Sequence, residues 1–244
     1  MKKLTGMYVQ QTRFFASDVV PYHLVITSLG SNRLRQAFGF GSTNWQENLE
    51  YIFQDGTIEH QGRTVPITWA SFHDRRILIQ VLGNSSAAHA AYSAISEVLT
   101  ELDPGFRNAT PLVSTEETSC AAQLDFEWTA LFNPALVEHV SQRVQEFSSE
   151  QVGRFIKGVS ARFTLGIERK SKDLSEHGIN LFDQNLIIEP RADTPLSERI
   201  YYTYSPCDSD THLKLVSELE ANLAGRSRSG RSRRKTSARK QKRP

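Results

Sequence analysis

The sequence predicts an α+β fold in which antiparallel sheets are covered on one face by helices, followed by a disordered basic tail. Several segments alternate apolar and polar residues with a period of two, which buries one face of a strand and exposes the other. Other segments repeat their apolar residues at helical spacing. The last nineteen residues contain ten lysines and arginines and no acidic residue. One-sided strands are typical of antiparallel sheets with helices on a single face.

The composition fits one large or two small domains of a soluble globular protein. Of the 244 residues, 39% are apolar and 23% are charged, and the mean hydropathy is −0.43. No apolar run approaches the roughly eighteen residues of a membrane-spanning helix, and the first residues are too polar for a signal peptide. Two cysteines, Cys120 and Cys207, exclude a disulfide scaffold. We therefore expect an intracellular, cytoplasmic protein, or a nuclear one if the source is eukaryotic.

The strands are predicted from the alternation. In residues 122–132, apolar side chains at the even positions alternate with polar ones until Leu131 interrupts the pattern. Residues 159–169 repeat the same alternation, so both segments are expected to bury one face. The full set of predicted strands is 7–16, 22–28, 64–71, 76–82, 122–132, 159–169, 179–189 and 199–204.

Three helices are predicted from apolar stripes and from their capping residues. One of them follows Asn133 and Pro134, which are favoured as N-cap and first helical residue. Another is followed by Gly225, which we expect to end it. The predicted helices are 86–102, 135–147 and 210–224.

The body divides most naturally at a stretch rich in Pro, Gly, Ser and Thr that lacks any periodicity. A repeat at an offset of 123 residues favours two similar halves. Arg76 and Arg199 each begin a predicted strand, and His89 and His212 lie early in the helix that follows. The expected organisation is a strand-rich half 1–104, a connecting segment 105–119, a second half 120–225 and a tail 226–244.

The net charge of +2 hides an acidic body and a strongly basic tail. Removing the ten basic tail residues from the totals of 29 basic and 27 acidic leaves 19 and 27, a net charge of −8. The tail has no large apolar residue and its charges repel, so we expect it to be disordered. Such clusters bind nucleic acid by releasing counterions from phosphates, without reading base sequence. The predicted nucleic-acid-binding residues are Arg226, Arg228, Arg231, Arg233, Arg234, Lys235, Arg239, Lys240, Lys242 and Arg243.

No motif indicates a cofactor, a metal or a catalytic nucleophile. The seven histidines form no His-x-x-x-His unit, and the cysteines form no Cys-x-x-Cys unit. Gly39 and Gly41 resemble the start of a phosphate loop, but no third glycine or Lys-Ser/Thr pair follows. Cys207 precedes a predicted helix, and an isolated cysteine of this kind is more often an inert thiol than a nucleophile. We expect no cofactor, no metal ligands and no catalytic residues.

Three carboxylates support a different hypothesis. Asp125 and Glu127 share the polar face of one predicted strand, and Glu168 lies on the polar face of another. If those strands are neighbours, the carboxylates converge on a divalent ion, with Lys170 orienting a water. A solvated sheet face explains the same residues with fewer assumptions. That acidic face also argues against the body as a surface for stacking RNA bases.

Three functions are therefore compared. The first is a non-catalytic binding protein whose acidic body engages a protein partner or a second copy while its tail engages nucleic acid without sequence specificity. The second is a structural or adaptor oligomer with a solubilising tail. The third is a metal-dependent phosphodiesterase or nuclease. We expect the first, and more generally a protein that is not an enzyme.

Overall fold

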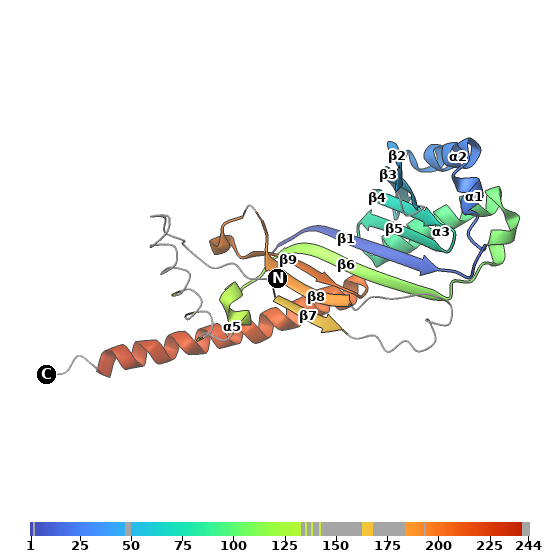
Figure 1. Cartoon of the computed structure of the whole chain (residues 1–244). Coiled ribbons are helices and arrows are strands. Elements are labelled where there is room, and N and C mark those ends of the chain that lie inside the picture. The colour runs from blue at the N-terminus through green and yellow to red at the C-terminus, as the bar shows by residue number, and fades with distance from the viewer. Residues whose placement is uncertain are drawn as a thin grey trace, which may run out of the picture.

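The computed structural model describes residues 1, 3–46, 50–132, 135, 138, 142, 163–167, 184–192 and 194–240, with side chains at 45–46, 128, 163–167, 184 and 225–240 left out of the description. These residues form a single antiparallel sheet with helices on one side, which confirms the α+β class (Figure 1). The strand order is β2-β3-β4-β5-β1-β6-β9-β8-β7. The strands are β1 Lys3–Phe14, β2 Ser42–Gln46, β3 Glu50–His60, β4 Arg63–His73, β5 Arg76–Leu82, β6 Val113–Gln123, β7 Phe163–Ile167, β8 Gln184–Pro190 and β9 Ile200–Ser205.

The helices begin and end at residues suited to those positions. Asn84 caps α3 by accepting from the amide of Ala87 at 3.0 Å, and Thr27 caps α2 by accepting from Gly30 at 3.1 Å. Gly39 ends α2 in the left-handed conformation (φ 65°), so the glycine pair at 39 and 41 belongs to a helix-to-strand turn. The helices are α1 Tyr22–Val25, α2 Ser28–Phe38, α3 Ser85–Leu102 and α5 Ser209–Lys240, with 3-10 turns η1 Pro104–Asn108, η2 Trp128–Leu131 and η4 Leu196–Glu198.

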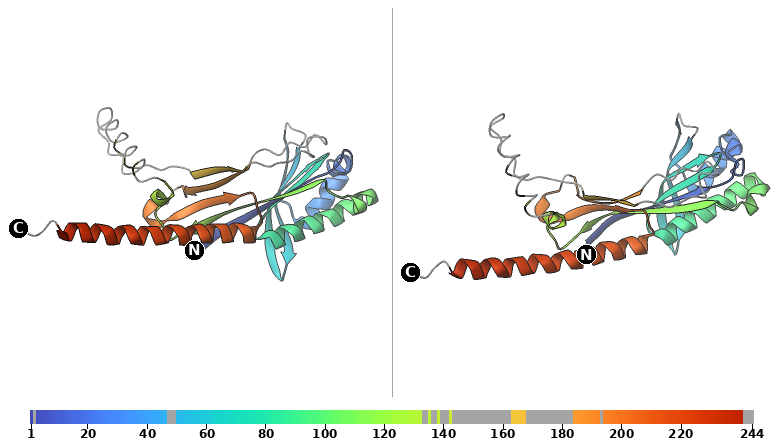
Figure 2. Two further views of the ribbon diagram at one scale, coloured as in Figure 1. Left: turned by 90° about the horizontal axis from the view of Figure 1, so that it is seen from below. Right: turned by 60° about the horizontal axis from the view of Figure 1, so that its bottom comes forward.

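The two long helices lie on the same side of the sheet. α3 and α5 meet at their N-termini and run outward from this junction in opposite directions (Figure 2). The strands β1 and β6 pair with each other at the centre of the sheet, with β5 on the outer side of β1 and β9 on the outer side of β6. In the chain, α3 comes directly after β5 and α5 comes directly after β9, so each long helix is connected to one of the two strands that flank the central pair.

The buried apolar residues that the structure describes form two clusters, one under each long helix. The first cluster packs α1, α2 and α3 against β1, β3, β4 and β5, with Phe15, Phe53 and Phe72 fully buried. The second cluster packs α5 against β6, β8 and β9 and includes Phe126 and Tyr201. These two aromatic rings stack with centroids 5.1 Å apart, and the Tyr201 hydroxyl donates to the carbonyl of Phe126.

The structure corrects three predicted elements. Residues 22–28 form α1 and the start of α2 rather than a strand, because a short apolar run does not distinguish the two. The predicted strand 122–132 ends at Gln123, after which η2 forms. The predicted connecting segment 105–119 contains η1 and most of β6. β2, β3 and α2 were not predicted, and the division of the body into halves remains a prediction.

The end of the last helix is also different from the prediction. α5 continues through Gly225 and Gly230 to Lys240, since each glycine inside a helix costs only about 1 kcal/mol. The disorder of the isolated tail 226–244 remains a prediction for the protein in solution, since like charges one turn apart oppose a helix. The predicted helix 135–147 lies mostly outside the described residues. Of its positions, residues 135, 138 and 142 are helical and exposed.

Candidate functional site

The basic segment is joined directly to a helix that is fixed in the second core. In α5, His212, Val216, Glu220 and Leu223 follow one another at spacings of three and four residues, and all four are buried. The helix then runs past the end of the sheet as a projecting segment (Figure 1). The backbone of 226–240 extends about 22 Å at 1.5 Å per residue. Eight of the ten predicted nucleic-acid-binding residues lie on it, and Lys242 and Arg243 lie outside the described residues.

A buried polar cluster surrounds His212 where α5 meets the sheet. Its Nε2 lies 3.0 Å from Thr203 Oγ1 and 3.4 Å from Cys120 Sγ, and its Nδ1 lies 2.6 Å from Ser205 Oγ. Ser205 Oγ is in turn 2.9 Å from Cys207 Sγ. The members of this cluster come from β6, β9, α5 and the connection between β9 and α5, and they share no local motif by which the sequence could reveal them.

The electrostatics of this cluster argue against nucleophilic chemistry. Burial lowers the pKa of His212 to about 4, so its imidazole is neutral at pH 7. Burial raises the pKa of the Cys120 thiol, and burial is also the largest cause of the raised pKa of Cys207. A reactive cysteine needs a lowered pKa, whereas both thiols remain protonated. The cluster is therefore a structural contact between α5 and the sheet, and it supports the interpretation of Cys207 as an inert thiol.

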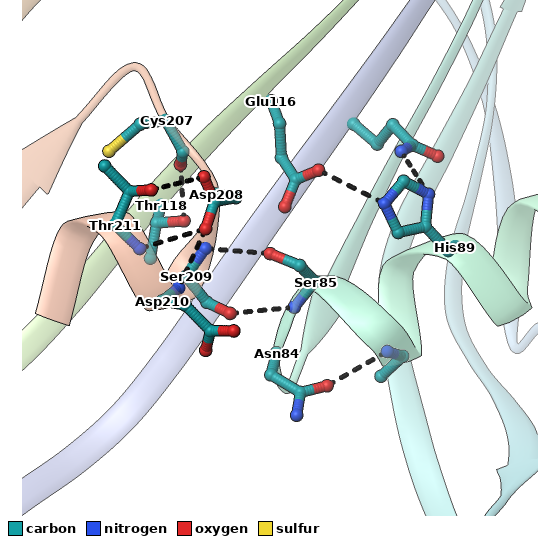
Figure 3. Close-up of polar contacts among 12 residues, drawn as sticks. Asn84, Ser85, His89, Glu116, Thr118, Cys207, Asp208, Ser209, Asp210 and Thr211 are labelled. Atoms are coloured by element: carbon teal, nitrogen blue, oxygen red, sulfur yellow. Dashed lines mark hydrogen bonds and ion pairs between the residues drawn. The ribbon is translucent and has the colours of Figure 1, made fainter.

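The junction of the two helix N-termini is closed by its own side chains (Figure 3). The amide of Ser85 donates to Ser209 Oγ at 3.1 Å, and the amide of Ser209 donates to Ser85 Oγ at 2.8 Å. Just before α5, Asp208 Oδ1 accepts from the amides of Asp210 and Thr211 at 3.1 and 2.9 Å. These amides would bind an anion if they were open to a ligand. Because they are used internally, the junction joins two helices rather than forming a phosphate site.

A second group of polar contacts, beside this junction, joins α3 to the two central strands. His89 on α3 lies 2.8 Å from Gln11 through its Nδ1, and its Nε2 lies 3.6 Å from Glu116 on β6 (Figure 3). The side chain of His89 is 55% exposed, so this contact is open to solvent. His89 thus has a structural role between β1, β6 and α3.

The carboxylates considered as metal ligands are placed around an arginine. Arg199 Nη1 lies 3.3 Å from Asp125 Oδ1, and Arg199 Nη2 lies 3.6 Å from Glu127 Oε1. Glu168 and Lys170, the other predicted members of that site, lie outside the described residues. Within the described part of the chain, no group of three His, Cys, Asp or Glu side chains is arranged to hold a metal ion. The guanidinium of Arg199 therefore balances the negative charge of Asp125 and Glu127.

The sheet face turned away from the helices carries aromatic side chains that sequence analysis assigned to no surface. Tyr8 and Tyr204 are both paired with Ser119, which places them in one row across β1, β6 and β9. Tyr8 is 38% exposed, and Tyr202 and Tyr204 are half-buried. The signal was present in β9, where Tyr202 and Tyr204 alternate with the buried Tyr201 and with Thr203. β6 ends at Gln123, so Asp125 and Glu127, which were expected on the exposed face of a strand 122–132, are not part of this sheet face.

The described helices include none with the length and apolar character needed to cross a membrane. No protein-family model matches the sequence, and a search of curated proteins finds no match.

Proposed function

We propose that this protein is a non-catalytic binding protein that connects a protein partner, or a second copy of itself, to nucleic acid. The observation that supports this function is the continuity of α5. Its first part is packed in the second core, and its last part carries basic residues past the end of the sheet. A partner held by the body is thereby linked to whatever the basic segment binds.

The division of charge supports nucleic acid as the ligand of the tail. The body carries a net charge of −8 and repels a polyanion, whereas the tail carries ten positive charges. Lysine and arginine side chains gain affinity from phosphates by releasing counterions. Contacts to phosphates position a protein on nucleic acid without reading its bases. We therefore propose binding without sequence specificity, inside the cell, in the cytoplasm or in a eukaryotic nucleus.

The experiment measures affinity for a short DNA duplex and for a single-stranded RNA as a function of salt concentration. The proteins are the full chain, residues 1–225, and a full-length variant with glutamine at the eight basic positions between 226 and 240. Each phosphate contact contributes about −0.9 to the slope of log K against log salt on duplex DNA. We expect a steep slope for the full chain and a loss of affinity in both altered proteins.

The matched control replaces two exposed arginines of the body, Arg63 and Arg107, by glutamine. These substitutions should leave the salt dependence unchanged, because the body does not contact the polyanion. If removing the tail leaves affinity and slope unchanged, the nucleic-acid proposal is wrong. Sedimentation of the same proteins at low and high salt examines the alternative function. An oligomer that forms without the tail, together with no nucleic-acid binding, would favour the structural or adaptor protein.

A nucleic-acid cleavage assay tests the phosphodiesterase hypothesis separately. The two described carboxylates of that site, Asp125 and Glu127, pair with Arg199, which favours an ion-pair cluster over a metal centre. We expect the purified protein to leave a labelled duplex intact in the presence of Mg²⁺ or Mn²⁺. Cleavage that disappears in a D125N variant would instead support the enzyme.

A further inference from the structure

We infer that the body contains two copies of one strand–strand–helix unit related by a local two-fold axis, and that polar residues in the second copy make α5 the more easily released of the two long helices. The first copy consists of β1, β5 and α3, and the second of β6, β9 and α5. This inference goes beyond the proposed function, because it concerns how α5 is held and does not depend on what the tail binds.

The strand register relates the two copies. Val9 pairs with Val81 in the first copy, and Thr118 pairs with Ser205 in the second. Val81 and Ser205 are 124 residues apart, the separation that also holds between Ser85 and Ser209. Val9 and Thr118 pair with each other across β1 and β6. In a two-fold arrangement, a position paired with its own counterpart lies on the axis. The axis therefore passes between Val9 and Thr118.

Equivalent hydrogen bonds just beyond the ends of β1 and β6 show the same offsets between the two copies. The amide of Phe15 donates to the carbonyl of Arg75 at 2.9 Å, and the amide of Leu124 donates to the carbonyl of Arg199 at 3.0 Å. Arg75 and Arg199 are again 124 residues apart. Residues 15 and 124 are 109 apart, as are residues 9 and 118. Phe15 and Leu124 are both buried, at 0% and 1% exposed.

The helix junction provides a third, independent observation. Ser85 and Ser209 are the first residues of α3 and α5, and each accepts a hydrogen bond from the amide of the other. The same atoms meet in both directions, which is the defining property of an isologous contact. In Figure 3 the two serines face each other between the two helices.

The offset of 123 residues predicted from the sequence is one residue short. A one-residue shift exchanges the two faces of a strand. Ile77 is fully buried, whereas Ile200, its partner at 123, is half-buried. At 124 the partner of Ile77 is Tyr201, which is 2% exposed. The exposed His89 and the buried His212 are likewise not counterparts.

The correct offset shows what the second copy has changed. Ile79, Val81 and Ala88 of the first copy correspond to Thr203, Ser205 and His212 of the second. All six side chains are at most 2% exposed. The first copy fills these positions with apolar groups alone, so the fold itself does not require polar atoms there. The hydrogen bonds between His212 and the hydroxyls of Thr203 and Ser205 are a feature of the second copy.

This change alters how strongly each helix is held. α3 buries seven side chains, of which six are aliphatic and the seventh is the aromatic ring of Tyr92. The described side chains of α5 bury only two apolar residues, Val216 and Leu223, beside Ser209, His212 and Glu220. Buried hydrogen-bonding groups regain water when a helix leaves the sheet, so they oppose its release less than apolar area does. α5 therefore opens as a local unit more readily than α3.

Hydrogen exchange of the full chain tests the inference. Protection factors are compared between amides 87–99 of α3 and amides 212–223 of α5. We expect α5 to be at least tenfold less protected than α3. A T203I/S205V/H212A variant, which places the first copy's residues in the second, should fold and raise the protection of α5 at least tenfold while leaving α3 unchanged.

Two further variants separate the parts of the inference. T203Q is the substitution that the offset of 123 residues would prescribe, and it should lower the protection of α5. V81S places the second copy's serine in the first and should lower the protection of α3 alone. Equal protection of α3 and α5 in the wild type would overturn the release of α5. If the triple variant unfolds, or if it protects α5 no better than T203Q does, the equivalence of the two copies is wrong.

Discussion

Glu220 on α5 accepts a hydrogen bond of 2.6 Å from the backbone amide of Asp125 through its Oε1. Its Oε2 pairs with the N-terminal amine of Met1, and the residue is only 7% exposed. Asp125 follows the end of β6, so this carboxylate fixes α5 two turns beyond His212. Burying a carboxylate is costly unless donors compensate its charge, and here the amide of Asp125 and the amine of Met1 do so.

Replacing Glu220 should therefore destabilise the body. E220A leaves the Asp125 amide without its acceptor and should lower the free energy of unfolding by about 2 kcal/mol, a typical value for a hydrogen bond to a charged group. Glu218 lies on the exposed side of the same helix, and E218A should change stability by less than about 0.5 kcal/mol. Urea unfolding measures both variants. Equal losses would show that Glu220 does not fix the helix.

Because Ser85 and Ser209 each accept a hydrogen bond from the amide of the other, we expect removal of either hydroxyl to lower stability by a similar amount. S85A and S209A each remove the acceptor for one N-terminal amide, and each should cost about 1 kcal/mol. S93A, on the exposed face of α3, is the control and should be close to neutral. Thermal or urea unfolding of the two single variants and of the double variant completes a double-mutant cycle. Losses that differ by more than about 1 kcal/mol would argue against equivalent roles for the two serines.

His212 should make stability depend on pH between about 6.5 and 4. Its folded pKa is lowered to about 4 from 6.5 by burial, so in this range the unfolded chain binds the proton more readily. The contribution of the neutral imidazole is complete above pH 6.5 and is lost as the pH falls toward 4. The slope from this one group approaches about 1.4 kcal/mol per pH unit.

Urea unfolding at several pH values checks this expectation. The H212A variant should lose that part of the slope, whereas H23Q, at an exposed position, should retain it. A slope that is the same in the wild type and in H212A would show that protonation of other groups accounts for the loss of stability.

Elements that fold on local signals were predicted from the sequence. α3 was predicted within one residue, because Asn84 caps its start and apolar residues follow at helical spacing. β5 and β9 were recognised from their alternation. The polar run in β6 was missed because Thr115 and Thr118 are buried only through the pairing of β6 with β1 and β9, which a local pattern does not contain.

The sequence by itself determined the fold class, the separation of an acidic body from a basic tail, and the residues of that tail, because charge and periodicity are properties of neighbouring residues. Tertiary structure alone decided that Thr203, Ser205 and His212 form a buried cluster, and that α3 and α5 meet at Ser85 and Ser209. These contacts depend on strand register. A shift of one residue turns every side chain of a strand to the other face, and register is set by pairing between strands distant in the chain.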